Sequence, residues 1–187
     1  MKSSSYSMHF LVIGLALIAS SCAEPERKAE TLPPSPEAKI VAQEQKASYV
    51  TEISFDKGST TLTPSAKSKL DETMQRARNA GVIDEIKVIA WADREYPSKA
   101  KKTLTKGQQK LAAGRGKAID SYLKQQTPAT VDNYNMSERP NALEKLFSSS
   151  DARIKRSLEE AGIATTAHDL RSPENASKAM VMLILKE

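Results

Sequence analysis

The hydrophobic pattern changes twice along the chain, and each change predicts a boundary. Residues 10–19 are almost continuously apolar, whereas residues 23–48 contain few large apolar side chains. From Tyr49 onward, apolar residues recur at the spacings typical of strands and helices. The pattern therefore predicts an N-terminal leader, a connecting segment and a single folded domain over residues 49–187.

The predicted domain alternates between strand and helix periodicities. Apolar residues at every second position predict a strand from Tyr49 to Phe55. The Thr63-Pro64 pair is typical of a helix start and Gly81 of a helix end, so a helix is predicted between them. The same reasoning predicts the remaining elements: a strand at Ile86–Trp91, a helix from about Gly107 to Gln125, a short strand at Thr130–Tyr134, one or two helices within residues 140–162, and a last strand at Ala179–Leu185.

Strands that alternate with helices predict the α/β class, here an α/β (α+β) two-layer sandwich in the order β-α-β-α-β-(α)-β. Both long helices are expected to pack on one face of the sheet. The last predicted strand is apolar throughout, so it is expected at the centre of the sheet. Residues 141–174 are expected to form a helical insertion before that strand.

The leader has the features of a secretory signal peptide. A basic head precedes the apolar run of residues 10–19, which is about half as long as the roughly 20 residues that a membrane-spanning helix needs. Small residues then lead into Cys22, the only cysteine, in a pattern that resembles the bacterial lipobox. This predicts removal of residues 1–21 and lipid attachment at Cys22. The alternative is ordinary cleavage after Ser21 or nearby, which leaves a free thiol.

Residues 22–48 are predicted to be a lipidated N-terminus followed by a flexible tether. The segment is rich in Pro, Glu, Ala and Lys, and it has too few large apolar residues to offset the entropy of folding. Ala23, in place of an aspartate after Cys22, resembles the outer-membrane sorting pattern of lipoproteins. The expected location is therefore the cell outer membrane, with the lipid-anchored domain facing the periplasm.

Composition excludes several classes of function. The formal net charge of +5 comes from scattered basic residues and not from a basic face with interleaved aromatics, so no nucleic-acid partner is predicted. One cysteine allows neither an internal disulfide nor a cysteine-based metal site. His168 lacks neighbours at metal-ligand spacing, and no nucleophilic or acid–base set is evident. The sequence predicts a binding protein without metal or cofactor and not an enzyme.

Two charged residues are the main candidates for a binding site. Asp93 closes a predicted strand and Arg115 lies on the next predicted helix. A carboxylate attracts an ammonium group, and a guanidinium can hold a carboxylate through two parallel hydrogen bonds, so the pair could hold a zwitterion. Taken alone, the two residues favour a structural interpretation, in which Asp93 caps a turn and Arg115 forms a surface ion pair.

Short sequence blocks occur in an order typical of one known family. The blocks are Ile53–Asp56, Leu62–Pro64, Ala92–Arg94, Leu111–Arg115, Ala118–Leu123, Pro128–Ala129 and Asn135–Pro140. With these blocks in register, the chain from about Tyr49 resembles the OmpA C-terminal-like domain, which also occurs in peptidoglycan-associated lipoproteins and flagellar stator proteins. The resemblance implies helices on one face of a mixed sheet.

Members of this family bind peptidoglycan through the diaminopimelate of its stem peptide. The resemblance implies that Asp93 accepts the ammonium end of that amino acid and that Arg115 grips its carboxylate. Gln108 stands where the family usually has asparagine, and its amide is expected to orient the loop or the ligand. The implied function is that of an outer-membrane lipoprotein that binds peptidoglycan non-covalently and tethers the membrane to the cell wall.

Some positions depart from the family pattern. Residues 90–92 are Ala-Trp-Ala where the family has Gly-His-Thr or Gly-Tyr-Thr, and Ser177-Lys178 replaces an arginine pair. The segment at 94–106 is longer than usual and basic. The alternative function is therefore an OmpA-like scaffold or adaptor lipoprotein that has lost wall binding. Such a protein would contact an envelope protein partner through the basic 94–106 loop and the 141–174 insertion.

Overall fold

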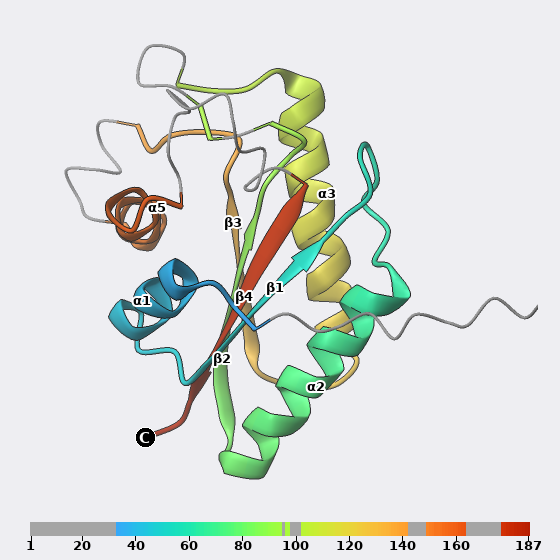
Figure 1. Cartoon of the computed structure of the whole chain (residues 1–187), viewed down its shortest axis with the longest axis vertical. Helices are drawn as coiled ribbons and strands as arrows, with labels where there is room; N and C mark the ends of the chain where they lie inside the picture. Colours follow the sequence, from blue (N-terminus) through green and yellow to red (C-terminus); the bar gives the residue numbers. More distant parts are fainter. Residues whose placement is uncertain (1–32, 95, 98–101, 142–148, 164–176) are drawn as a thin grey trace, which may run out of the picture. The chain divides into compact units, whose positions relative to one another are not determined.

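The computed structural model describes residues 33–94, 96–97, 102–141, 149–163 and 177–187 (Figure 1). The predicted signal peptide, Cys22, about half of the 141–174 insertion (residues 142–148 and 164–174) and part of the basic 94–106 loop (residues 95 and 98–101) lie outside the described residues. Within the described ranges, no helix has both the length and the apolar character needed to cross a membrane.

The described elements follow the predicted order, with one helix added before the first strand. The strands are β1 (Tyr49–Ser54), β2 (Ile83–Ala90), β3 (Thr130–Asn135) and β4 (Lys178–Leu185). The helices are α1 (Pro36–Glu44), α2 (Pro64–Ala80), α3 (Lys106–Leu123) and α5 (Ser150–Glu160). All four predicted strands and both long predicted helices are confirmed to within a few residues.

The four strands form one mixed sheet in the order β1-β4-β2-β3. Strand β4 is antiparallel to both of its neighbours, whereas β2 and β3 are parallel. The side chains of β4 are buried from Ala179 to Leu183. The predicted central position of this apolar strand is therefore confirmed.

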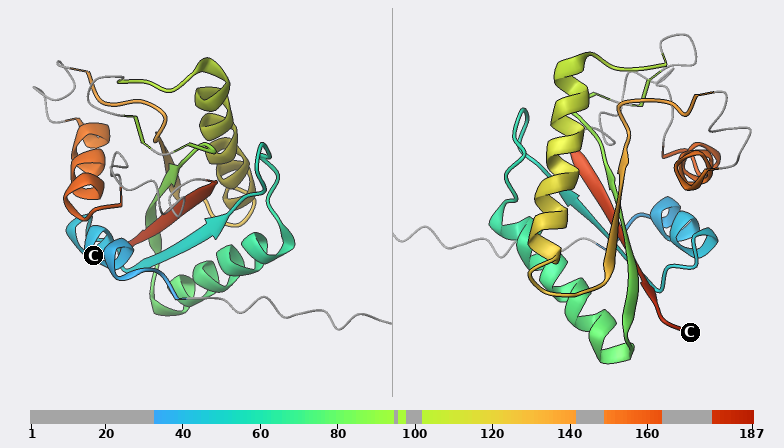
Figure 2. Two further views of the ribbon diagram at one scale, coloured as in Figure 1. Left: turned by 45° about the horizontal axis from the view of Figure 1, so that its top comes forward. Right: turned by 180° about the vertical axis from the view of Figure 1, so that it is seen from behind.

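Helices α2 and α3 cover one face of the sheet, as predicted (Figure 2). Helix α2 begins where the sequence indicated, because the Thr63 hydroxyl accepts a hydrogen bond from the Ala66 N–H at 3.1 Å and Pro64 occupies the first turn. The core of this face contains long aliphatic side chains from both helices and from the sheet, among them Leu70, Met74, Ile119, Leu123, Ile53, Ile86, Val88 and Val181.

Helices α1 and α5 lie on the opposite face, which adds a helical layer to the predicted α/β sandwich (Figures 1 and 2). Trp91 belongs to the core of this second face and is completely buried, which confirms its predicted place in the core. The other members of this core include Ile89, Tyr96, Tyr134, Met136, Ile154, Leu158, Met180 and Met182.

The predicted tether is wrong for residues 36–44, because they form α1 and pack on the sheet. Ser35 caps this helix by accepting a hydrogen bond from the Ala38 N–H at 3.2 Å. The backbone N–H of Ser35 donates to Glu52 in β1 at 2.8 Å. The buried side chains of α1 are only Ala38, Val41 and Ala42. Such small residues leave little hydrophobic signal among neighbouring Pro and Glu, which explains the wrong prediction.

Candidate ligand-binding site at the end of strand β2

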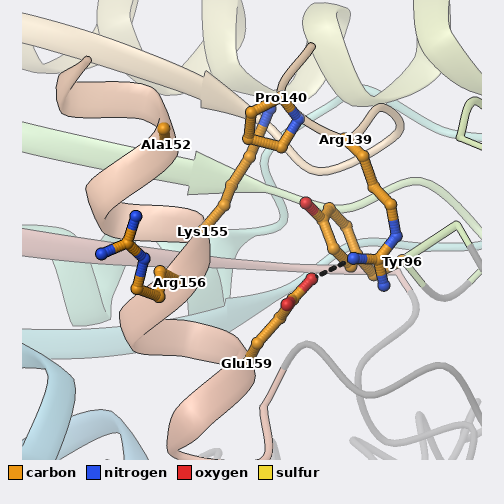
Figure 3. A pocket seen from close by; sticks show the side chains of 7 residues that line it. All are labelled: Tyr96, Arg139, Pro140, Ala152, Lys155, Arg156 and Glu159. Carbon is orange, nitrogen blue, oxygen red and sulfur yellow. Dashed lines mark hydrogen bonds and ion pairs between the residues drawn. The ribbon is translucent and has the colours of Figure 1, made fainter. Parts of the chain in front are cut away.

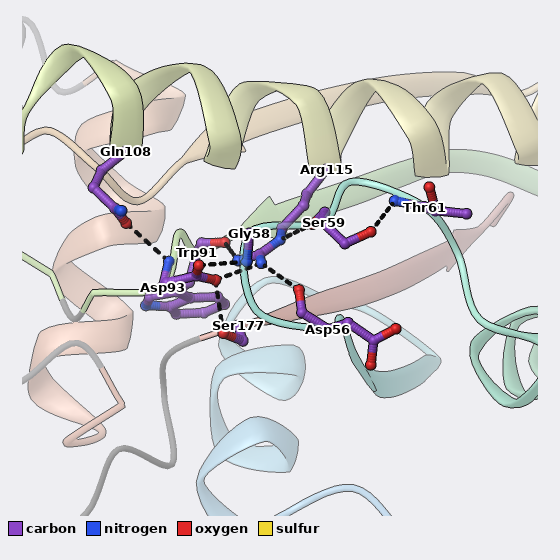
Figure 4. Close-up of polar contacts among 9 residues, drawn as sticks. All are labelled: Asp56, Gly58, Ser59, Thr61, Trp91, Asp93, Gln108, Arg115 and Ser177. Carbon is purple, nitrogen blue, oxygen red and sulfur yellow. Dashed lines mark hydrogen bonds and ion pairs between the residues drawn. The ribbon is translucent and has the colours of Figure 1, made fainter.

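The structure brings the two predicted site residues into direct contact (Figure 4). Asp93 follows the end of β2, and Arg115 projects toward it from α3. Arg115 Nη2 and Asp93 Oδ1 are 2.5 Å apart. The Arg115 side chain is 0% exposed and the Asp93 side chain is 10% exposed, so the carboxylate is the part of this pair that reaches the surface.

The Arg115 guanidinium is enclosed by backbone carbonyl groups in addition to Asp93. Its Nε donates to the Ser59 carbonyl at 2.9 Å, Nη1 to the Trp91 carbonyl at 2.9 Å and Nη2 to the Asp56 carbonyl at 3.1 Å. Each of its three nitrogens therefore has an oxygen partner within the protein. In this conformation Arg115 ties the turn after β1 to the end of β2, and it presents no surface to a ligand.

Two glycines allow α3 to approach its neighbours closely on either side of Arg115. A Cβ atom on Gly116 would lie 2.9 Å from the side-chain oxygen of Asn133 in β3. A Cβ atom on Gly114 would lie 2.8 Å from a methyl carbon of Thr60. A larger residue at either position would force the Thr60 or Asn133 side chain to move, so the glycines let α3 pack closely beside these residues on either side of Arg115.

Three donors converge on the Asp93 carboxylate. Oδ1 accepts from Arg115 and from the Ser177 hydroxyl at 2.8 Å, and Oδ2 accepts from the Gly58 N–H at 2.6 Å. Burial alone would raise the pKa of Asp93, but the hydrogen bonds from Arg115, Ser177 and Gly58 outweigh it and lower the pKa below its ordinary value. Asp93 is therefore a fixed anion at neutral pH.

The third predicted residue, Gln108, contacts the backbone of the loop. Its Oε1 accepts a hydrogen bond from the Asp93 N–H at 3.0 Å. Gln108 itself lies in the first turn of α3, which Thr105 caps. The contact ties the start of α3 to the loop that carries the carboxylate. Any contact between Gln108 and a ligand remains a prediction.

Sequence reasoning gave no site role to Ser177, although it lies at the centre of this arrangement. Ser177 has a positive φ of 57°. Its N–H donates to the Ala92 carbonyl and its carbonyl accepts from the Phe55 N–H, both at 2.7 Å. Ser177 thus joins the ends of β1 and β2 just before β4 begins. The role depends on strand order in space, which the sequence pattern around Ser177 does not contain.

A pocket of about 180 Å³ lies elsewhere, between α5 and the segments that carry Tyr96 and Arg139 (Figure 3). None of the predicted site residues lines it. Arg139 pairs with Glu159 and stacks over the Tyr96 ring at 4.5 Å. The buried Tyr96 hydroxyl has no hydrogen-bond partner among the described residues. Among the described residues, those that line the pocket include an internal ion pair but none of the hydrogen-bond partners of Asp93.

Comparison with known proteins identifies the family. No curated protein matches the chain. The family model of the OmpA family matches residues 54–156, which is more than half of the chain and includes Asp93, Gln108 and Arg115. This match supports an envelope-associated role with peptidoglycan as a partner. The chain belongs to the OmpA family.

Proposed function

We propose that this domain binds peptidoglycan non-covalently through the diaminopimelate of the stem peptide, and that the ligand's ammonium group pairs with Asp93. The observation that carries this proposal is a surface-reaching carboxylate fixed by three donors. A preorganised carboxylate loses little conformational freedom on binding, and a charge-assisted hydrogen bond to an ammonium group is about twice as strong as a neutral one. Membership of the OmpA family supports peptidoglycan as the source of that ammonium group.

A direct contact between Arg115 and the ligand would require Arg115 to move. To grip the ligand's carboxylate directly, as the family resemblance implies, Arg115 would have to release backbone carbonyls of the turn at residues 56–59 or of Trp91. Without such a movement, Arg115 acts through Asp93 by holding its carboxylate in place.

A sedimentation assay with purified sacculi tests the proposal. The wild-type domain should sediment with sacculi, Asp93→Asn should remain in the supernatant, and free diaminopimelate should compete. The matched control is Asp84→Asn, because Asp84 is exposed and lies near the opposite end of β2. It removes the same charge from the same strand and should sediment like wild type. Circular dichroism establishes that each variant is folded.

The second candidate function is an envelope scaffold that has lost wall binding. The complete enclosure of Arg115 favours this alternative, because it removes one of the two expected ligand contacts. Equal sedimentation of Asp93→Asn and wild type would contradict binding through Asp93, and absence of sedimentation by wild type would favour the scaffold.

The domain is further proposed to bind the wall without cleaving it. Prolonged incubation of sacculi with the wild-type domain should release no soluble muropeptides. Release of such fragments, detected by chromatography, would contradict this part of the proposal and would indicate a hydrolase.

The proposed anchor is lipid on Cys22, which would place the domain at the outer membrane and facing the periplasm. Metabolic labelling with palmitate should mark the wild-type protein and not Cys22→Ser, and the variant should move from the membrane fraction to the soluble fraction. An unlabelled wild type with a titratable free thiol would instead show that an ordinary signal peptidase processes the chain.

A further inference from the structure

The pocket between α5 and the segments that carry Tyr96 and Arg139, here called the Tyr96 pocket, contains a buried hydroxyl without a partner (Figure 3). Tyr96 is 3% exposed, and its hydroxyl forms no hydrogen bond with the described residues. The hydroxyl lies on the side of the ring that faces Lys155 and Pro140, which also line the pocket. A buried hydroxyl without a partner is unfavourable and uncommon in folded proteins. A ligand that accepts a hydrogen bond in this pocket would satisfy it.

The Tyr96 hydroxyl is held in place as a donor. Burial, together with the nearby Glu159 carboxylate, raises the pKa of the phenol above its ordinary value, so the hydroxyl keeps its proton at neutral pH. The Arg139 guanidinium stacks over the ring at 4.5 Å, and its Nε donates to the Pro97 carbonyl at 2.6 Å. These contacts fix the ring before any ligand binds, which lowers the entropy lost on binding.

The charged side chains around the pocket leave an excess of one positive charge. Arg139 pairs with Glu159, and Lys155 pairs with Asp151 at 2.9 Å. Arg156 also lines the pocket, is exposed to solvent and has no carboxylate partner among the described residues. Three cationic side chains are thus balanced by two carboxylates. A ligand with one negative charge would neutralise the excess, whereas a dianion would exceed it.

Lys155 supplies a second donor, and the size of the pocket limits the ligand. The Lys155 side chain is only 4% exposed, and its ammonium group has three N–H donors, more than the single Asp151 oxygen beside it can accept. The volume of about 180 Å³ corresponds to about six water molecules and is smaller than the roughly 300–1,000 Å³ of pockets for drug-sized ligands. Pro140 and Ala152 add an apolar wall.

We propose that the Tyr96 pocket is a binding site for a small monocarboxylate. The ligand carboxylate accepts hydrogen bonds from the Tyr96 hydroxyl and the Lys155 ammonium group, and its short carbon chain contacts Pro140 and Ala152. Arg156 attracts the anion electrostatically. This site is separate from the one proposed for peptidoglycan, because no hydrogen-bond partner of Asp93 lines the pocket.

NMR titration of the isotope-labelled protein with sodium propionate tests the ligand class. Propionate replaces chloride at constant ionic strength, so that a general salt effect is excluded. The signals of the Ala152 methyl group and the Tyr96 ring should shift saturably, with a Kd of about 1 mM. Propionamide has the same shape without the charge, and methyl phosphate is a dianion at pH 8. Each should bind at least about tenfold more weakly than propionate. Equal or tighter binding of either compound, or no saturable shift with propionate, would overturn the proposal.

Tyr96→Phe tests the role of the hydroxyl. The ring and its stacking with Arg139 are kept and no protein hydrogen bond is lost, so stability in urea should equal or exceed that of wild type. The affinity for propionate should nevertheless fall at least about tenfold.

The matched control is Tyr134→Phe. Tyr134 is 5% exposed and belongs to the same core, but its hydroxyl already bonds Ser150 at 3.0 Å and does not line the pocket. This variant should lose stability and bind propionate like wild type. Unchanged affinity in Tyr96→Phe, or an equal loss of affinity in both variants, would overturn the assignment of the Tyr96 hydroxyl.

Discussion

The two faces of the sheet differ in how they are covered. Helices α2 and α3 have 17 and 18 residues, and they bury stripes of Leu, Met and Ile. On the other face, α1 and α5 have 9 and 11 residues, and the buried side chains of α1 are no larger than valine. Isolated helices of that length are marginal in water, so α1 and α5 depend on packing against the sheet and against each other.

The candidate site belongs to the first face. Arg115 comes from α3, and the turn that encloses it leads into α2. The second face contributes Trp91, whose carbonyl accepts from Arg115 while its ring packs in the other core. We therefore expect changes on the first face to impair both the fold and the site. Changes on the second face should impair local stability while the site persists.

The largest effect is expected from Arg115→Ala. Removing one partner of a buried ion pair typically costs about 3–5 kcal/mol, and here it also leaves three carbonyl groups without their donor. The comparison on the second face is Arg139→Ala, which should cost less because its partner Glu159 keeps one-third of its side chain exposed to water. Urea unfolding measures both free energies. Equal losses would mean that the two ion pairs are equivalent.

Substitution of one leucine in each core tests whether the two cores unfold separately. Leu70 in α2 and Leu158 in α5 are both buried, and Leu→Ala at such positions costs about 2–5 kcal/mol. Leu70→Ala should lower the global free energy of unfolding. Leu158→Ala should mainly speed hydrogen exchange in α1 and α5, because these short helices can open separately. If folded Leu158→Ala failed to sediment with sacculi, this would contradict the expectation that changes on the second face leave the site intact.

The pH dependence of stability should reflect protonation of the Asp93 carboxylate. The pKa of Asp93 is lowered in the folded protein, so its contribution is fully present above its unfolded pKa of about 3.9. The contribution should decline as the pH falls through the lower, folded pKa. The difference in urea stability between wild type and Asp93→Asn should therefore be constant near neutral pH and should narrow only below about pH 4. A difference that grows on acidification would contradict the lowered pKa.

The smallest expected effect concerns the cap of α1. Ser35→Ala removes the acceptor for the Ala38 N–H and should cost about 0.5–2 kcal/mol of local helix stability. Trp91 is the single tryptophan and shares a core with α1, so its emission should shift to longer wavelength if the helix detaches. Ser54→Ala is the control, since Ser54 is exposed at the end of β1. An identical emission spectrum and exchange rate in Ser35→Ala would show that the cap contributes nothing.

The elements with strong periodic patterns could be predicted from the sequence, and those that depend on spatial neighbours could not. The alternation of apolar residues in β1 and the Thr63-Pro64 start of α2 are local signals, and both match the structure. The contact between Asp93 and Arg115 also followed from their places at a strand end and on the next helix.

The parts that could not be predicted have non-local causes. Helix α1 is stable because it packs on the sheet and because Ser35, which caps it, donates a hydrogen bond to Glu52. Ser177 contacts Asp93 only because β4 lies between β1 and β2. The enclosure of Arg115 depends on where the carbonyls of Asp56 and Ser59 point, which residue types do not encode. The sequence therefore indicated that Asp93 and Arg115 carry complementary charges, but it did not indicate that Arg115 is inaccessible to a ligand.

The position of β4 has a consequence for the order in which the protein can assemble. This strand is the last described element in the chain, yet it pairs with both β1 and β2. Until β4 docks, β1 has no partner strand in the described sheet. The parallel β2–β3 pair is the only strand pair that can form without β4, so completion of the sheet waits for contacts between distant parts of the chain. Such a topology favours slow folding.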